Sequence, residues 1–111
     1  MLFFDGCPGH ERLLPVVRRL AADAGAEVRL RRVETLDEAE AERFLGSPTV
    51  RVDGRDVDPG AEHRDDYGLK CRIYRFDGTQ SPAPPEAWIQ AALDRATRRA
   101  LGDLRSNRVV P

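Results

Sequence analysis

The chain has 111 residues, 41% of them hydrophobic and 33% charged, which is enough apolar material for one domain with one packed core. A net charge of −1 gives no basic field that would recruit nucleic acid or an anionic membrane. No apolar run reaches the length that spans a bilayer and no signal-peptide pattern opens the sequence, so we expect a cytoplasmic location.

The first predicted elements are a short strand and a helix. Leu2–Phe4 is an apolar run that ends at a turn, which indicates a buried strand. The apolar residues that follow recur at helical spacing and stop at Gly25, which predicts a helix with one buried face. Pro15 lies inside this helix, and we expect it to produce a kink. The predicted buried face comprises Leu13, Val17, Leu20, Ala21 and Ala24.

A second strand and a second helix follow. Glu27–Val33 alternates apolar and polar side chains, which favours a strand. Thr35 and Glu38 form a capping box, in which the threonine hydroxyl accepts a backbone N–H and the glutamate reaches back. The helix that they open is predicted to run to Leu45 and to end at Gly46.

Two more strands and a third helix complete the prediction. Thr49–Val52 is followed by the hairpin turn Asp53-Gly54, and after a polar loop the segment Leu69–Phe76 alternates, with Leu69, Cys71 and Ile73 on one side. Pro84-Pro85-Glu86 opens the last helix. Its predicted buried residues are Trp88, Ile89, Ala92, Leu93, Ala96 and Ala100. The predicted domain spans residues 1–101, and residues 102–111 are expected to form a flexible tail.

The order of elements is therefore β-α-β-α-β-β-α, which predicts an α/β fold. A right-handed crossover makes the first two strands parallel, and the hairpin or the loop after it makes the last two antiparallel. We expect a mixed four-stranded sheet with helices on both faces.

Cys7 occupies the most distinctive position in the sequence, directly after the first strand and at the start of the first helix. A sulfur there faces unpaired backbone N–H groups and the positive end of the helix dipole, which favour the nucleophilic thiolate. His10 lies on the same side of the first turn, where its cation would lower the thiol pKa further. The alternative is a small buried hydrophobe beside an exposed polar residue. The position at a helix start favours the reactive interpretation.

A second candidate element is Ser47-Pro48-Thr49 at the start of the third predicted strand. Proline cannot donate to a strand ladder and therefore belongs at a strand start. In the proposed topology this point lies beside the end of the first strand, so Pro48 would face Cys7. The alternative is an ordinary trans proline in a loop, which base rates favour.

These elements together resemble the thioredoxin superfamily over nearly the whole chain. Cys7-x-x-His10 stands where that family carries Cys-x-x-Cys, Pro15 matches the kink proline of the active-site helix, and Ser47-Pro48-Thr49 matches the cis-proline segment. The segments Phe4–Pro8 and Gly46–Thr49 are also similar to those of a group of short bacterial thioredoxin-like proteins. Some members of that group carry selenocysteine at the position of Cys7. The resemblance implies a single thioredoxin-like domain with a cis Ser47-Pro48 bond.

We therefore expect one-thiol redox chemistry at Cys7. The thiolate would attack a disulfide, a peroxide or another soft electrophile, and an outside thiol such as glutathione would resolve the product. His10 would stabilise the thiolate or move a proton. Pro48 and the backbone of Thr49, with Ser47, would hold the incoming chain in an extended pose. No cofactor is needed, and the partner is a protein or a small thiol or disulfide.

Cys71 is the only other thiol in the chain. The predicted strand places it more than the ~7 Å Cα limit for a disulfide from Cys7, so we expect no bond. We interpret Cys71 as a core or sheet residue, and a resolving role is the minority interpretation. A zinc set of Cys7, His10, His63 and Cys71 matches no common spacing, so we predict no metal site.

The competing hypothesis is a thioredoxin-fold binding module without turnover. Such a module would use the Cys7 edge and the loop Arg55–Leu69 to hold a partner or a soft metal ion. The thiol pKa of Cys7 separates the two hypotheses, because a binding module has no need to depress it.

Overall fold

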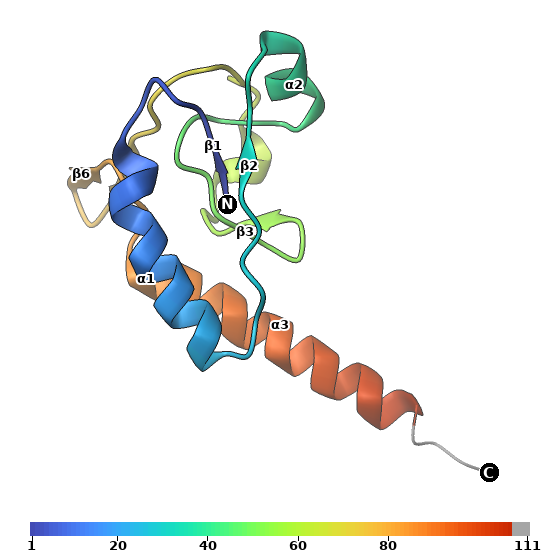
Figure 1. Ribbon diagram of the computed structural model, residues 1–111. Helices are drawn as coiled ribbons and strands as arrows, with labels where there is room; N and C mark the ends of the chain where they lie inside the picture. Colours follow the sequence, from blue (N-terminus) through green and yellow to red (C-terminus); the bar gives the residue numbers. More distant parts are fainter. Residues whose placement is uncertain (108–111) are drawn as a thin grey trace.

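The computed structural model describes the backbone of residues 1–107 and the side chains of residues 1–101. The described chain contains three α-helices and six short strands in an α/β arrangement (Figure 1). The helices are α1 (Gly9–Asp23), α2 (Leu36–Ala41) and α3 (Glu86–Asn107), with a 3-10 turn, η1, at Ala61–His63. The strands are β1 (Leu2–Phe3), β2 (Arg31–Arg32), β3 (Arg51–Val52), β4 (Arg55–Asp56), β5 (Tyr74–Phe76) and β6 (Thr79–Ser81).

Helix boundaries follow the local signals of the sequence. Gly25 takes a positive φ of 69° directly after α1, the conformation that ends helices and that glycine adopts without strain. Pro15 lies inside α1. The Thr35 hydroxyl accepts the Glu38 N–H at 3.1 Å and begins α2, which ends at Ala41, earlier than predicted. The backbone of α3 continues to Asn107; the rest of the predicted tail, residues 108–111, lies outside the described residues.

The strands pair two by two. β1 and β2 are parallel, as expected for the crossover through α1, and β3 and β4 form the predicted antiparallel hairpin around Asp53-Gly54. β5 and β6 form a second hairpin that the sequence analysis did not predict. It forms because Asp77 and Gly78, both with positive φ angles, make a type I′ turn that brings β6 beside β5.

The expected four-stranded sheet is absent from the described residues. Instead, two isolated bridges join the ladders: Leu2 pairs antiparallel with Thr49, and Ser47 pairs parallel with Cys71. Pro48 lies between the two bridging residues and has no N–H to donate, so regular pairing cannot pass through it. The bridges nevertheless place β2, β1, the 47–52 segment and the Cys71 segment side by side in that order.

Two apolar clusters lie on opposite sides of β1. Met1 belongs to the cluster that α1 and α3 share with Val50 and Val57, and Leu2 belongs to the cluster that α2 covers. The side chains of Met1 and Leu2 lie in different clusters because successive side chains of an extended chain point to opposite faces. Figure 1 shows α1 crossing α3, whose C-terminal half extends away from the body. Within the described residues, no helix is both long and apolar enough to cross a membrane.

Candidate redox site

The turn before α1 fixes the position of Cys7. The Cys7 N–H donates to the Phe4 carbonyl at 3.3 Å, and a Cβ on Gly6 would lie 2.2 Å from the Phe4 ring, so a larger residue at position 6 would require that ring to move. Pro8 is the N-cap of α1, and no described side chain caps that helix start. Cys7 therefore precedes a helix terminus whose positive end favours an anion beside it.

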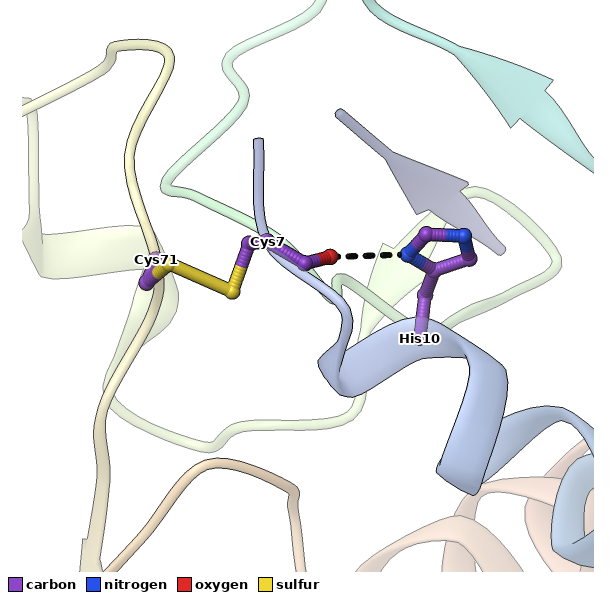
Figure 2. Close-up of a disulfide and its surroundings, with 3 residues drawn as sticks. All are labelled: Cys7, His10 and Cys71. Carbon is purple, nitrogen blue, oxygen red and sulfur yellow. Dashed lines mark hydrogen bonds between the residues drawn. A yellow bond between two sulfur atoms is a disulfide. The ribbon is translucent and has the colours of Figure 1, made fainter. Parts of the chain in front are cut away.

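Cys7 forms a disulfide with Cys71 (Figure 2). Their Cα atoms are 5.5 Å apart, a separation typical of disulfides. The expectation that Cys71 lies beyond bonding reach is therefore wrong. The reason is the parallel bridge between Ser47 and Cys71, which brings the Cys71 segment to the end of the molecule where α1 begins.

The two cysteines differ in exposure. Cys7 is 6% exposed, whereas Cys71 is an exposed residue. Cys7, which was expected to be accessible, is thus a buried residue in the disulfide-bonded structure, and Cys71 is the more exposed residue of the pair.

His10 lies on the other side of the Cys7 backbone from the disulfide (Figure 2). Its Nδ1 is 2.9 Å from the Cys7 carbonyl oxygen, and its ring stacks on Phe3 with ring centroids 4.3 Å apart. The neutral tautomer that makes this hydrogen bond carries its proton on Nδ1. His10 therefore orders the first turn of α1 through a backbone contact.

The Ser47–Pro48 peptide bond is cis, as predicted. Pro48 packs against the start of α1: its Cδ lies 3.5 Å from the position that a Cβ on Gly9 would occupy. Both main-chain groups of Thr49 bond to Leu2, at 2.8 and 2.9 Å. The Ser47 N–H donates to the Lys70 carbonyl at 2.8 Å. The backbone expected to hold an incoming chain is thus already paired.

Gly46 permits this pairing. It has a φ of +124°, and a Cβ there would lie 2.9 Å from the Lys70 carbonyl oxygen and 3.0 Å from the Arg72 Cβ. The two segments therefore approach each other at a distance that only glycine allows.

Arg72 is buried beneath the same segment. It is 2% exposed, and its guanidinium bonds to both carboxylate oxygens of Asp56, at 2.7 and 3.2 Å, and to Asp58 at 3.2 Å. It also donates to the Thr49 hydroxyl at 3.1 Å. Burial by itself lowers the pKa of Arg72, but the bond to Asp56 and the neighbouring negative charges outweigh it and the pKa is raised. Arg72 thus remains charged in a buried, paired position.

Tyr74 extends the Arg72 network to Pro48. The tyrosine is fully buried and donates its hydroxyl to the Pro48 carbonyl, while the Arg72 guanidinium lies 4.4 Å from the centre of its ring. Burial raises the pKa of Tyr74 above its ordinary value. Arg72 and Tyr74 together tie the Cys71 segment to the Pro48 segment.

Sequence reasoning missed this network. The alternation of Leu69, Cys71 and Ile73 predicted a strand with these apolar residues on one side, yet Ile73 is 47% exposed, whereas Arg72 and Tyr74 are buried. The available signal was the pair Asp56 and Asp58, which can neutralise one buried arginine.

Among the residues whose side chains are described, no group of three or more His, Cys, Asp or Glu is placed to hold a metal ion. His63 is exposed on η1, next to Glu62. No family model, curated protein or solved structure matches this chain.

Proposed function

We propose that this protein is a thioredoxin-like thiol–disulfide oxidoreductase with Cys7 and Cys71 as its redox pair. One observation carries the proposal: a buried cysteine at a helix start is bonded to an exposed cysteine, with Cα atoms 5.5 Å apart. The order of the first elements, the helices on both sides of β1 and the cis-Pro48 beside the pair support a thioredoxin-like fold.

The environments of the two sulfurs assign their roles. An incoming thiolate reaches the exposed residue, Cys71, and the leaving group is then the sulfur of Cys7. A thiolate at Cys7 is favoured by the positive end of α1, and a leaving thiol of lower pKa departs faster. The geometry therefore favours attack at Cys71.

The exchange cycle balances within the pair. In the reduced protein, the Cys71 thiolate attacks a substrate disulfide, so that one S–S bond forms to Cys71 and one substrate thiolate leaves with the electron pair. The Cys7 thiolate then attacks Cys71, restores the Cys7–Cys71 bond and expels the second substrate thiolate. Two molecules of a thiol such as glutathione reduce the pair again and leave as their own disulfide.

This scheme alters the one-thiol mechanism expected from the sequence. Cys71 replaces Cys7 as the attacking thiol, because Cys7 is buried. Cys7 replaces the outside thiol that resolves the mixed disulfide. His10 contributes by holding the Cys7 carbonyl. Ser47, Pro48 and Thr49 support the pair, since their backbone bonds go to Leu2 and to the Cys71 segment.

A binding module without turnover is the second candidate. One observation favours it: the Cα atoms of the two cysteines are 5.5 Å apart. After reduction, two thiolates at this separation could bind one soft ion such as Cu(I), which thiolates select. The two candidates differ in whether the protein turns over a disulfide substrate.

The test uses two variants that each keep one thiol. Reduced Cys7→Ser is expected to accumulate a stable mixed disulfide at Cys71 when oxidised glutathione is added. Cys71→Ser is expected to react about tenfold more slowly, because its remaining thiol is buried. Wild type should release glutathione and re-form the Cys7–Cys71 bond. Intact mass and peptide mapping measure the products, and glutathione-dependent reduction of hydroxyethyl disulfide measures turnover.

Two results would contradict the scheme. Faster capture at Cys7 than at Cys71 would reverse the assigned roles. Wild-type protein that forms the disulfide but reduces no hydroxyethyl disulfide would leave the binding module as the better description.

A further inference from the structure

Two buried side-chain atoms lack a hydrogen-bond partner in the described part of the chain, Ser47 Oγ and Arg72 Nε. Both belong to neighbours of Cys71: Arg72 follows it in sequence, and Ser47 is its bridge partner. Buried polar atoms nearly always have partners, so each exception requires an explanation. The terminal nitrogens of Arg72 bond to two carboxylates and a hydroxyl. Ser47 differs from Arg72, because the only polar atom of its side chain, Oγ, is the one without a hydrogen-bond partner.

The bridge places Ser47 and Cys71 on the same side of the ladder. The Ser47 N–H bonds to Lys70 and the Ser47 carbonyl accepts the Arg72 N–H at 2.9 Å, so Ser47 and Cys71 are directly paired. Directly paired residues carry their side chains on one face, and sequence neighbours point to the other. Consistent with this, the missing Cβ of Gly46 faces Arg72 Cβ. The Ser47 hydroxyl and the Cys71 thiol therefore share a face, and the Arg72 guanidinium occupies the opposite one.

We propose that the Ser47 hydroxyl is the hydrogen-bond donor that stabilises the Cys71 thiolate in the reduced protein. The inference rests on the proposed exchange function, in which Cys71 acts as nucleophile. A disulfide sulfur carries no charge and is a weak acceptor, whereas a thiolate forms a charge-assisted hydrogen bond. Reduction thus supplies the acceptor that the hydroxyl lacks in the disulfide-bonded structure.

No other nearby group is as well placed for this role. The positive end of α1 serves Cys7, which directly precedes that helix. The charge of Arg72 is taken by Asp56 and Asp58 on the opposite face. Lys70 points its ammonium group to Asp66, at 2.8 Å. Ser47 is 0% exposed, so water competes poorly for the hydrogen bond that its hydroxyl would donate.

The experiment titrates Cys71 as the only thiol, in the Cys7→Ser background. Thiolate absorbance against pH is measured with and without Ser47→Ala, and Ser81→Ala is the matched control, since its hydroxyl bonds locally to the Ala83 N–H. Ser47→Ala is expected to raise the pKa of Cys71 by about one, a roughly tenfold loss of thiolate at neutral pH. The control should leave the titration unchanged, and Ser47→Thr, which keeps the hydroxyl, should stay near the Cys7→Ser value.

A structural role for the hydroxyl predicts a different pattern. Because Ser47 Oγ has no partner in the disulfide-bonded protein, Ser47→Ala should leave the unfolding midpoint of that form unchanged or higher. A folded Ser47→Ala variant with an unchanged Cys71 titration would overturn the inference. The titration needs no substrate, so it tests the inference separately from the proposed function. If Ser47→Ala raises the pKa of Cys71 but the wild-type protein turns over no disulfide, the proposed function is wrong and the inference holds.

Discussion

The segment that carries Cys71 has two sides with opposite character. On one side, Arg72 and Tyr74 are buried and bonded to two carboxylates, a hydroxyl and a backbone carbonyl. On the other side, Cys71 and Ile73 are exposed, and the buried hydroxyl of Ser47 has no hydrogen-bond partner among the described residues. Although Arg72 Nε has no partner among the described residues, a polar network bonded at several points holds a segment in one position. The buried side therefore positions Cys71, and the hydroxyl of Ser47 on its exposed side is left with unused hydrogen-bonding capacity.

This contrast also explains why the Cys71 segment stays in place. Its backbone pairs with Ser47, but a single bridge next to a proline is a weak attachment. The ion pairs of Arg72 are the stronger anchor, because removing one partner leaves an uncompensated buried charge. Reduction of the disulfide should then free the thiols without releasing the segment.

The largest expected effect comes from removing the anchor. Arg72→Met leaves Asp56 and Asp58 without their cation, and we expect it to lower the free energy of unfolding by about 3–5 kcal/mol. Arg75→Met, at an exposed position of β5, is the matched control and should change it by less than about 0.5 kcal/mol. Urea unfolding of the disulfide-bonded proteins measures both. Equal stabilities would mean that the Arg72 side does not hold the segment.

A smaller effect is expected from separating the two paired segments. Gly46→Ala forces a Cβ against Lys70 and requires a side chain at a φ of +124°, whereas Gly54→Ala also requires a positive φ, of +80°, but has nothing within 4 Å of its Cβ. We expect about 1 kcal/mol of destabilisation at Gly54 and about 2–3 kcal/mol at Gly46. Gly46→Ala should also slow re-formation of the Cys7–Cys71 disulfide after reduction. If both variants lose the same stability, the close approach at Gly46 contributes nothing.

The smallest expected effect concerns Tyr74. Tyr74→Phe removes the hydrogen bond to Pro48 and should cost about 1 kcal/mol at neutral pH. Burial raises the folded-state pKa of Tyr74, so the unfolded chain loses this proton first, and stability falls as the pH rises above about 10. Tyr74→Phe should therefore show a shallower alkaline decline than wild type.

Chemical unfolding at a series of alkaline pH values measures the Tyr74 effect. Tyr67→Phe is the control, because Tyr67 is only partly buried and makes no side-chain bond to Pro48. A wild-type decline that Tyr74→Phe reproduces in full would assign the alkaline transition to other groups.

The sequence by itself determined the helix ends, caps and turns, because these depend on residues that are close together in the chain. The end of α1 at Gly25, the cap of α2 at Thr35 and the hairpin turn at Asp53-Gly54 all appear where they were predicted. Each depends on contacts within a few residues, such as a cap hydroxyl or a glycine at positive φ. The cis bond at Pro48, implied by the thioredoxin resemblance, is present too.

Only the tertiary structure decided the partner of Cys7 and the buried side of the Cys71 segment. Cys7 and Cys71 are 64 residues apart, and a parallel rather than antiparallel bridge at Ser47 brings them together. The apolar pattern put Leu69, Cys71 and Ile73 on one side of the predicted strand, but the side that is buried carries Arg72, whose guanidinium Asp56 and Asp58 neutralise. Local periodicity counts arginine as a surface residue, and whether its charge can be buried depends on carboxylates that the fold brings to it.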